Sequence, residues 1–272
     1  MVYIEKNVTG QEVSTGFHKI RQIRFLTEST FVLRLDRGNI QFKAGQHIIV
    51  GLPGELNQRE YSVYSGEKED FLEILVREVI NGNVSLKLKQ CKPGQLLQVN
   101  GPFGSFGLER FDMFTRKLVF IASGTGIAPF HSFVRSYPGI NYVLIHGVRS
   151  NNEAYERNDY DPQKYILCTS KESNGGHKGR VTRFLPGYPV DPDMLFYICG
   201  NNNMIYEVYH ILRDKGIPDE SIFSEYIFED RIQSYLSFGN GIPHKHNSLF
   251  TRSRGTYSFC ALSESLNQLI GI

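Results

Sequence analysis

The sequence predicts a β plus α/β protein of two domains, an antiparallel β-barrel followed by a domain built on a parallel sheet. Through the first hundred or so residues, short runs of alternating apolar and polar residues are separated by Gly, Pro, Asn and Asp, which is typical of a small antiparallel barrel. From about Arg116 the strands become continuously apolar and alternate with helical stretches. That second pattern indicates a parallel sheet covered on both faces.

In the first half, Phe31, Leu33 and Leu35 alternate with polar neighbours and predict a half-buried strand. One helix is expected at 83–91, directly after the turn Asn81-Gly82-Asn83. Further strands are expected at 46–52, 60–65, 71–79 and 95–100.

In the second half, Lys117–Ala122 is a continuous apolar run followed by a glycine-rich turn, so we expect a buried strand that leads into a helix. Similar buried strands are expected at Asn141–Val148, Lys164–Thr169 and Met194–Gly200. We expect the break between domains within 107–116. The predicted division is 1–112, 113–228 and a C-terminal extension at 229–272, whose role the sequence does not indicate.

Composition excludes several classes of function. The chain has 30 Lys+Arg against 28 Asp+Glu, and this net charge of +2 argues against nucleic acid as the main partner. No apolar run approaches the roughly 18 to 20 residues that span a bilayer, and the N-terminus does not resemble a signal peptide. The four cysteines lie far apart without a C-x-x-C pair, so no metal site is predicted. Free thiols and the absence of an export signal predict a cytoplasmic location.

Five short motifs follow one another along the chain. They are R-x-Y-S at 59–62, G-x-x-S at 82–85, G-P-F-G-S-F at 101–106, G-T-G-x-A-P at 124–129 and C-G-x-x-x-M at 199–204. In this order they closely resemble the ferredoxin–NADP reductase family, over roughly residues 17–228. The resemblance implies an FAD-binding barrel, an NADP-binding α/β domain, and electron transfer between NADP(H) and a one-electron carrier protein, ferredoxin or flavodoxin.

The first motif offers the residue types that a flavin requires. Arg59 presents a forked cation suited to phosphate oxygens, and Tyr61 presents a ring that can stack on the isoalloxazine. Ser62 offers a hydroxyl within reach of flavin N5. The resemblance assigns these roles to the three residues and adds Val76 to the FAD-binding set.

The second motif, from Gly82 to Ser85, opens the predicted helix of the barrel. Backbone N–H groups at a helix start, together with the Ser85 hydroxyl, form an anion site for the FAD diphosphate. Taken alone, Ser85 is equally well explained as a simple helix N-cap.

On the nicotinamide side, the turn containing Gly124, Thr125 and Gly126 joins a buried strand to a helix, and the resemblance places Thr125 near both cofactors. The resemblance also puts the Cys199 thiol beside the nicotinamide, where it positions C4 against flavin N5 without acting as a covalent nucleophile. Ser62, Cys199 and Glu225 are therefore the expected catalytic residues. Glu225 is a candidate proton relay, although a plain surface glutamate explains it nearly as well.

Tyr226 is expected near the flavin ring. Because the chain continues for 44 residues beyond Phe228, where plant-type members end, Phe228 or a residue of the extension remains an alternative for shielding the ring.

Three cations are candidates for the 2′-phosphate of NADP: Arg149, Lys171 and Arg180. They favour NADPH over NADH, and solvated surface charges are the alternative explanation. In the family an Arg usually stands where Lys171 stands, so the forked contact is lost here.

The sequence says less about the electron acceptor than about the cofactors. Lys87, Lys89 and Lys92 lie in a stretch without acidic residues between Glu78 and Glu109, and these cations either steer an acidic carrier or form a solvated helix face.

Two rival functions stay open. One is an NAD(P)H-dependent flavin or cytochrome reductase, and the other is an electron-entry subunit of a larger complex. Such subunits often carry a late cysteine cluster, whereas only Cys260 follows Cys199 here.

Overall fold

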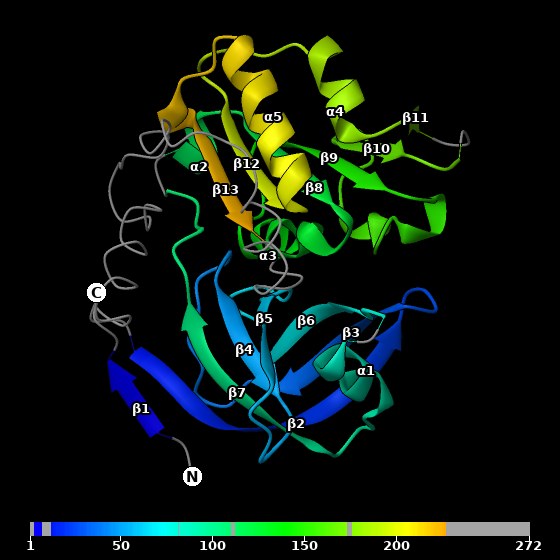
Figure 1. The fold of residues 1–272 in the computed structure, drawn as a ribbon. Helices are drawn as coiled ribbons and strands as arrows, with labels where there is room; N and C mark the ends of the chain where they lie inside the picture. Colours follow the sequence, from blue (N-terminus) through cyan, green and yellow to red (C-terminus); the bar gives the residue numbers. More distant parts are fainter. Residues whose placement is uncertain (1–2, 7–11, 81, 110–111, 173–175, 227–272) are drawn as a thin grey trace, which may run out of the picture. The chain divides into compact units, whose positions relative to one another are not determined.

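The computed structural model describes residues 3–6, 12–80, 82–109, 112–172 and 176–226, and it contains two sheets (Figure 1). The first is antiparallel and nearly closes into a barrel, and the second is parallel throughout. The predicted fold class is therefore confirmed. The predicted extension 229–272 and Phe228 lie outside the described residues, and the predicted domain boundaries remain predictions.

Within the described residues, the barrel is built from seven strands and one helix. Its strands are β1 (Tyr3–Lys6), β2 (Glu12–Phe25), β3 (Thr30–Asp36), β4 (His47–Gly51), β5 (Gln58–Ser62), β6 (Phe71–Arg77) and β7 (Leu96–Phe103), and its helix is α1 (Asn83–Gln90). The strand order is β5-β4-β7-β2-β3-β6, with β1 paired to β2. An antiparallel bridge between Val63 and Ile74 joins the chain just after β5 to β6, which brings the two ends of this path together.

The interior of the barrel contains Phe31, Leu33 and Leu35 of β3, as their alternation predicted. The 14-residue strand β2 was not predicted. Its pairing with β3 shifts register between Ile20 and Gln22, and this irregularity interrupts the two-residue period by which a strand is recognised.

The parallel sheet has the order β11-β10-β9-β8-β12-β13. Its strands are β8 (Leu118–Ser123), β9 (Tyr142–Val148), β10 (Tyr165–Thr169), β11 (His177–Lys178), β12 (Leu195–Gly200) and β13 (Ile222–Tyr226). The helices are α2 (Asp112–Thr115), α3 (Ala128–Ser136), α4 (Val181–Phe184) and α5 (Asn202–Asp214). Short 3-10 turns occur at η1 (Gly124–Ile127), η2 (Asn151–Glu153), η3 (Arg157–Asp159), η4 (Leu185–Gly187) and η5 (Asp219–Ser221).

Both faces of the parallel sheet are buried, which explains the continuous apolar runs in its strands. Phe120 and Tyr197 pack with the aromatic side chains of α3, whereas Phe196 and Ile198 on the opposite face pack with α4 and α5. Strand β8 has β9 on one side and β12 on the other. The connections therefore diverge at the carboxyl ends of β8 and β12, where open α/β sheets form their ligand crevice.

Candidate active site

The turns that follow β8 and β12 approach each other so closely that only glycine fits. A Cβ added to Gly126 would lie 2.3 Å from the backbone oxygen of Cys199. A Cβ added to Gly200, whose φ is +144°, would lie 2.2 Å from Ser123 Oγ. That hydroxyl also accepts a 2.9 Å hydrogen bond from the backbone N–H of Asn201. The G-T-G and C-G motifs are therefore packed against one another at the switch point of the sheet.

His146 holds the backbone carbonyl of Gly124 in place. Its Nε2 lies 2.9 Å from Gly124 O, and its Nδ1 lies 2.6 Å from the Tyr165 hydroxyl. Because a carbonyl only accepts, Nε2 carries the proton and Nδ1 accepts from Tyr165. Burial lowers the pKa of His146 to about 4, so the ring is neutral at pH 7. Sequence reasoning missed this residue, whose role depends on pairing between β8 and β9.

The three expected catalytic residues come together in the structure. Cys199 on β12 is the register partner of Glu225 on β13. Glu225 Oε2 accepts a 3.2 Å hydrogen bond from Ser62 Oγ at the end of β5. Burial, and secondarily the nearby Glu225 carboxylate, raise the pKa of Cys199 well above its usual value. The thiol is therefore protonated, in keeping with a positioning role and against a nucleophilic one.

His47 also reaches this group, and sequence reasoning missed it. It is the register partner of Ser62 on the adjacent strand, and its Nδ1 lies 3.8 Å from Glu225 Oε1. Its ring packs near Phe103 with centroids 5.9 Å apart. In the sequence His47 is one polar residue in a strand, and only the pairing of β4 with β5 brings it beside Ser62.

Two of the residues expected to bind the flavin, Arg59 and Tyr61, lie on β5. Arg59 is exposed, and Tyr61, two residues further on the same strand, is half-buried against the barrel core. Burial raises the pKa of the Tyr61 hydroxyl, so the ring is uncharged at neutral pH. Val76 is fully buried among the core side chains, and hence only its backbone is placed to face a ligand.

The G-x-x-S loop is closed tightly around its own serine. Gly82 is the N-cap of α1, and a Cβ on it would lie 2.9 Å from Ser85 Oγ. Ser85 Oγ accepts a 3.1 Å hydrogen bond from Val79 N. The simple N-cap interpretation of Ser85 is therefore wrong, because the hydroxyl binds the loop before the helix and keeps its own hydrogen available to donate.

Arg77, at the end of β6, points toward the nicotinamide-side turn. A Cβ on Gly124 would lie 3.7 Å from Arg77 Nη1, and among the described residues Arg77 has no ion-pair partner. A half-buried guanidinium without a counter-ion fits an anionic ligand. Sequence reasoning missed this residue, although a cation directly before the G-x-x-S loop was a usable signal.

The three cations expected to bind a 2′-phosphate follow neighbouring strands of the parallel sheet. Arg149 follows β9, Lys171 follows β10 and Arg180 follows β11, and all three are exposed. The backbone N–H of Lys171 donates to Arg149 O at 2.9 Å, which ties the first two segments together. Two carboxylates brace the same loops, because Glu153 accepts from Arg149 N and Glu172 accepts from Asn151 N.

The α1 lysines differ from their sequence interpretation. Lys87 is paired with Glu55 at 2.6 Å, and Lys89 is paired with Glu78. Among the lysines considered, Lys92 has no ion pair within the described part of the chain. The stretch without acidic residues is real in sequence, but the fold supplies glutamates from other strands and loops.

Comparison with known proteins agrees with this geometry. Residues 20–107 match the oxidoreductase FAD-binding domain family, and residues 120–210 match the oxidoreductase NAD-binding domain family. Together these matches cover more than half of the chain. The chain belongs to the ferredoxin reductase-type family of FAD- and NAD-binding oxidoreductases. Its two halves are thus an FAD-binding and a nicotinamide-dinucleotide-binding domain.

Individual relatives and structures show where the similarity lies. The chain is 28% identical over 234 residues to a ferredoxin–NADP reductase of Azotobacter vinelandii, which covers 73% of this chain and 89% of that protein. It is 28% identical over 223 residues to the toluate 1,2-dioxygenase electron transfer component of Pseudomonas putida, which covers 76% of this chain and 66% of that protein.

A Neisseria gonorrhoeae ferredoxin NADP+ reductase with bound FAD and NADP shares the fold, with a TM-score of 0.71 and 22% identity over 79% of this chain and 99% of that one. The chain spans less than two thirds of another curated relative, a terephthalate 1,2-dioxygenase reductase component of Comamonas, of which it covers 62%. Within the described residues, no helix is long and apolar enough to cross a membrane.

Proposed function

We propose that this family member is an FAD-dependent reductase that moves electrons between NADP(H) and a separate one-electron carrier protein, ferredoxin or flavodoxin. The observation that carries the proposal is the convergence of Ser62 from the barrel with Glu225 and Cys199 from the parallel sheet. A reductase of this kind needs its flavin strand and its nicotinamide strands to meet at one point. Bound FAD supplies the chemistry of accepting hydride from a nicotinamide and passing electrons on one at a time.

The residues present fit the two cofactors. The turns at Gly82, Gly126 and Gly200 leave no room for a side chain because neighbouring protein atoms pack against them, and this packing fixes the helix starts whose backbone N–H groups suit a diphosphate. Arg77 is a half-buried cation without an ion-pair partner among the described residues, located beside the Gly124 turn. Both observations favour bound anions at these loops.

On the flavin side, Arg59, the Gly82 loop and the free hydrogen of Ser85 hold the diphosphate, and Tyr61 covers the ring. The Ser62 hydroxyl donates to Glu225 and would lie beside the ring nitrogen of a bound flavin, so Glu225 is placed to take or supply a proton through Ser62. His47 is placed to pair with the other oxygen of that carboxylate.

On the nicotinamide side, the Gly124–Gly126 turn and Arg77 hold the diphosphate, while Thr125 and the protonated Cys199 thiol locate the nicotinamide ring. Tyr226 is the residue proposed to lie near the flavin ring. Its backbone pairs with Gly200 at the end of β12, which is consistent with that role.

A test of the catalytic group is the pair Ser62→Ala and Glu225→Gln, followed by stopped-flow reduction of the flavin with NADPH. We expect the rate to fall by roughly a hundredfold, the usual scale for losing a positioned proton-transfer group. Glu220→Gln is the control, because Glu220 is exposed in the turn before β13. Unchanged rates in both variants would remove Ser62 and Glu225 from the mechanism.

NADPH is the proposed donor because three cations follow β9, β10 and β11. Lys171→Gln and Arg180→Gln should each raise KM for NADPH by about tenfold or more and leave KM for NADH unchanged, since a hydrogen bond to a charged group contributes about 1.5–3 kcal/mol. Arg149→Gln should raise KM for NADPH in the same way. Lys68 is an exposed barrel residue, so Lys68→Gln should leave both KM values unchanged. Equal effects on NADPH and NADH would reject the 2′-phosphate assignment.

The carrier is proposed on the relatives' functions, which include ferredoxin–NADP reductase and electron transfer components of dioxygenases. An electron-entry role in an oxygenase system and a flavin or cytochrome reductase are the second candidates. Steady-state rates with ferredoxin, flavodoxin, free FMN and cytochrome as acceptors separate them, and fast turnover with free FMN alone would reject the carrier protein.

A further inference from the structure

One face of α3 is held by hydrogen bonds against the barrel segment that follows β5. His131 Nδ1 lies 2.7 Å from Tyr64 O, and Ser132 Oγ donates to Ser65 O at 2.7 Å. One turn later, Ser136 Oγ accepts from Glu67 N at 2.9 Å. Tyr64 lies two residues after Ser62, and α3 continues directly from the Gly124–Ile127 turn. These bonds therefore connect the flavin strand to the nicotinamide turn.

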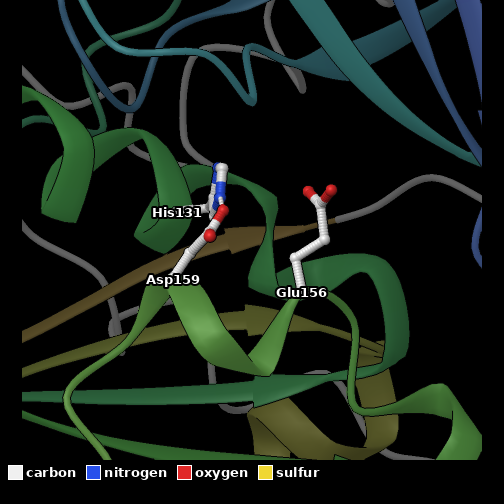
Figure 2. A group of neighbouring side chains, drawn as sticks. All are labelled: His131, Glu156 and Asp159. Carbon is white, nitrogen blue, oxygen red and sulfur yellow. Dashed lines mark hydrogen bonds and ion pairs between the residues drawn. The ribbon is translucent and has the colours of Figure 1, made fainter.

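The second ring nitrogen of His131 faces a carboxylate. Its Nε2 lies 2.9 Å from Asp159 Oδ2, and Figure 2 shows the two side chains directed at one another. A backbone carbonyl and an ionised carboxylate can only accept hydrogen bonds. Both ring nitrogens of His131 must therefore carry a proton, which makes the side chain an imidazolium. The ring is 1% exposed and stacks on the Tyr64 ring at 3.7 Å, so this cation is held inside the protein.

A divalent cation is the alternative that the geometry raises. His131, Glu156 and Asp159 offer ligand atoms within 4.8 Å of one another. However, Arg24 is bound to Glu156 at 2.7 Å, and Arg135 Nη1 lies 3.5 Å from Asp159. These two arginines also pair with Glu73 and Glu69, and Arg34 pairs with Glu73 as well. Three guanidinium groups therefore face four carboxylates, so one proton on His131 balances the group and a doubly charged ion overcompensates it.

The surroundings of His131 are set by charges from several elements. The titratable and charged groups that face it or its direct partners are Asp159 and Glu156 near η3, Arg24 of β2, Glu73 of β6, Glu69 before β6, Arg135 of α3 itself, and the hydroxyls of Tyr64 and Tyr160. The hydrogen bond from His131, and then its charge, lower the pKa of Asp159, so that carboxylate stays ionised.

We propose that His131 is a positioning residue for the reaction, held as an imidazolium by Asp159 and fixing the strand that carries Ser62 against the turn that carries Thr125. This inference rests on the proposed function. Without the Asp159 carboxylate the ring is held only through Nδ1 and by stacking on Tyr64, so α3 loses one of the contacts that fix it against the flavin strand.

The test combines one spectrum with a set of rates measured at one pH. Long-range proton–nitrogen NMR of the holoprotein should show both ring nitrogens of His131 protonated. In Asp159→Ala, flavin reduction by NADPH should slow by about tenfold, the scale expected from a small misplacement of the reacting groups. Asp159→Asn should restore most of the rate, because its amide N–H can donate to a neutral Nε2 and keep the ring in place. Asp161→Ala, which removes an exposed carboxylate two residues away, should leave the rate unchanged.

Three results would overturn the proposal: a His131 ring with only one protonated nitrogen, a wild-type rate in Asp159→Ala, or stoichiometric zinc whose removal by a chelator abolishes flavin reduction. Failure of the proposed function has a different signature, because NADPH would then never reduce the flavin of the wild-type protein at any pH. The NMR spectrum reports on His131 in either case.

Discussion

Replacing Gly126 with alanine tests the packing of the two motif turns. The added Cβ would lie 2.3 Å from Cys199 O, 2.6 Å from Cys199 C and 2.7 Å from Gly200 Cα. Real Cβ atoms essentially never approach within 3.0 Å, so the turn after β8 or the end of β12 must move by about 0.7 Å. All three obstructing atoms belong to the backbone. No flexible side chain can therefore relieve the overlap.

The expected cost follows from that geometry. Forcing atoms into a packed region typically costs 1–3 kcal/mol, and the upper value of about 3 kcal/mol applies because backbone must shift. For a protein of this size the melting temperature should fall by roughly 6 to 12 °C. NADPH binding should weaken together with stability, because the same turn carries Thr125, whereas bound FAD should be retained at pH 7.

Urea unfolding followed by circular dichroism measures the change in stability, and equilibrium titration measures the change in NADPH affinity. Gly187→Ala is the matched control in the same half of the chain, because a Cβ there meets no atom within 4 Å. Its effect should stay within about 1 kcal/mol. A Gly126→Ala protein with wild-type stability and NADPH affinity would refute the account of the switch-point turns.

Two further predictions concern charge. Burial lowers the pKa of His146 from 6.5 in the unfolded chain to about 4 in the folded protein. The neutral ring therefore contributes its full share of the free energy of unfolding above pH 6.5. That contribution, about 3 kcal/mol, is lost progressively as the pH falls toward 4. Urea unfolding at pH 7, 5.5 and 4 should therefore show a steeper loss for wild type than for His146→Gln, and parallel losses would contradict the buried neutral ring. Of the α1-region lysines, Lys87 and Lys89 are neutralised by glutamates, so Lys92→Gln should weaken the salt dependence of carrier reduction more than Lys89→Gln does. Equal effects in the two variants would contradict the idea that the ion pair with Glu78 removes the influence of Lys89 on the carrier.

Much of the fold was predictable because its signals are local. Strands β8, β9, β10 and β12 are buried on both faces and are thus apolar throughout, which a single sequence displays directly. Strand β2 was missed because its register shift beside Ile20 breaks the alternation, and β11 was missed because it has only two residues.

The candidate site divides in the same way. Ser62 and Cys199 were predicted because each lies in one of the five motifs, and Glu225 was predicted from the family resemblance; the structure brings the three residues together. His47 and His146 were missed because their roles arise from strand pairing, which the local pattern does not encode.

For the helix lysines, the sequence suggested free charges that the structure shows to be paired. Lys87 and Lys89 looked unopposed in sequence, whereas Glu55 and Glu78 neutralise them across distances that no local pattern reports. The spacing of Ser85 was ambiguous between an N-cap and a loop contact, and only the loop geometry decided it.

The most direct test of the central claim is the visible spectrum of the purified protein, followed by anaerobic titration with NADPH and then NADH. We expect a flavin spectrum that NADPH bleaches at far lower concentration than NADH. Bleaching by NADH at lower concentration would keep the flavin site and reject the phosphate roles of Arg149, Lys171 and Arg180. A colourless protein that cannot be reconstituted with FAD would contradict the account itself.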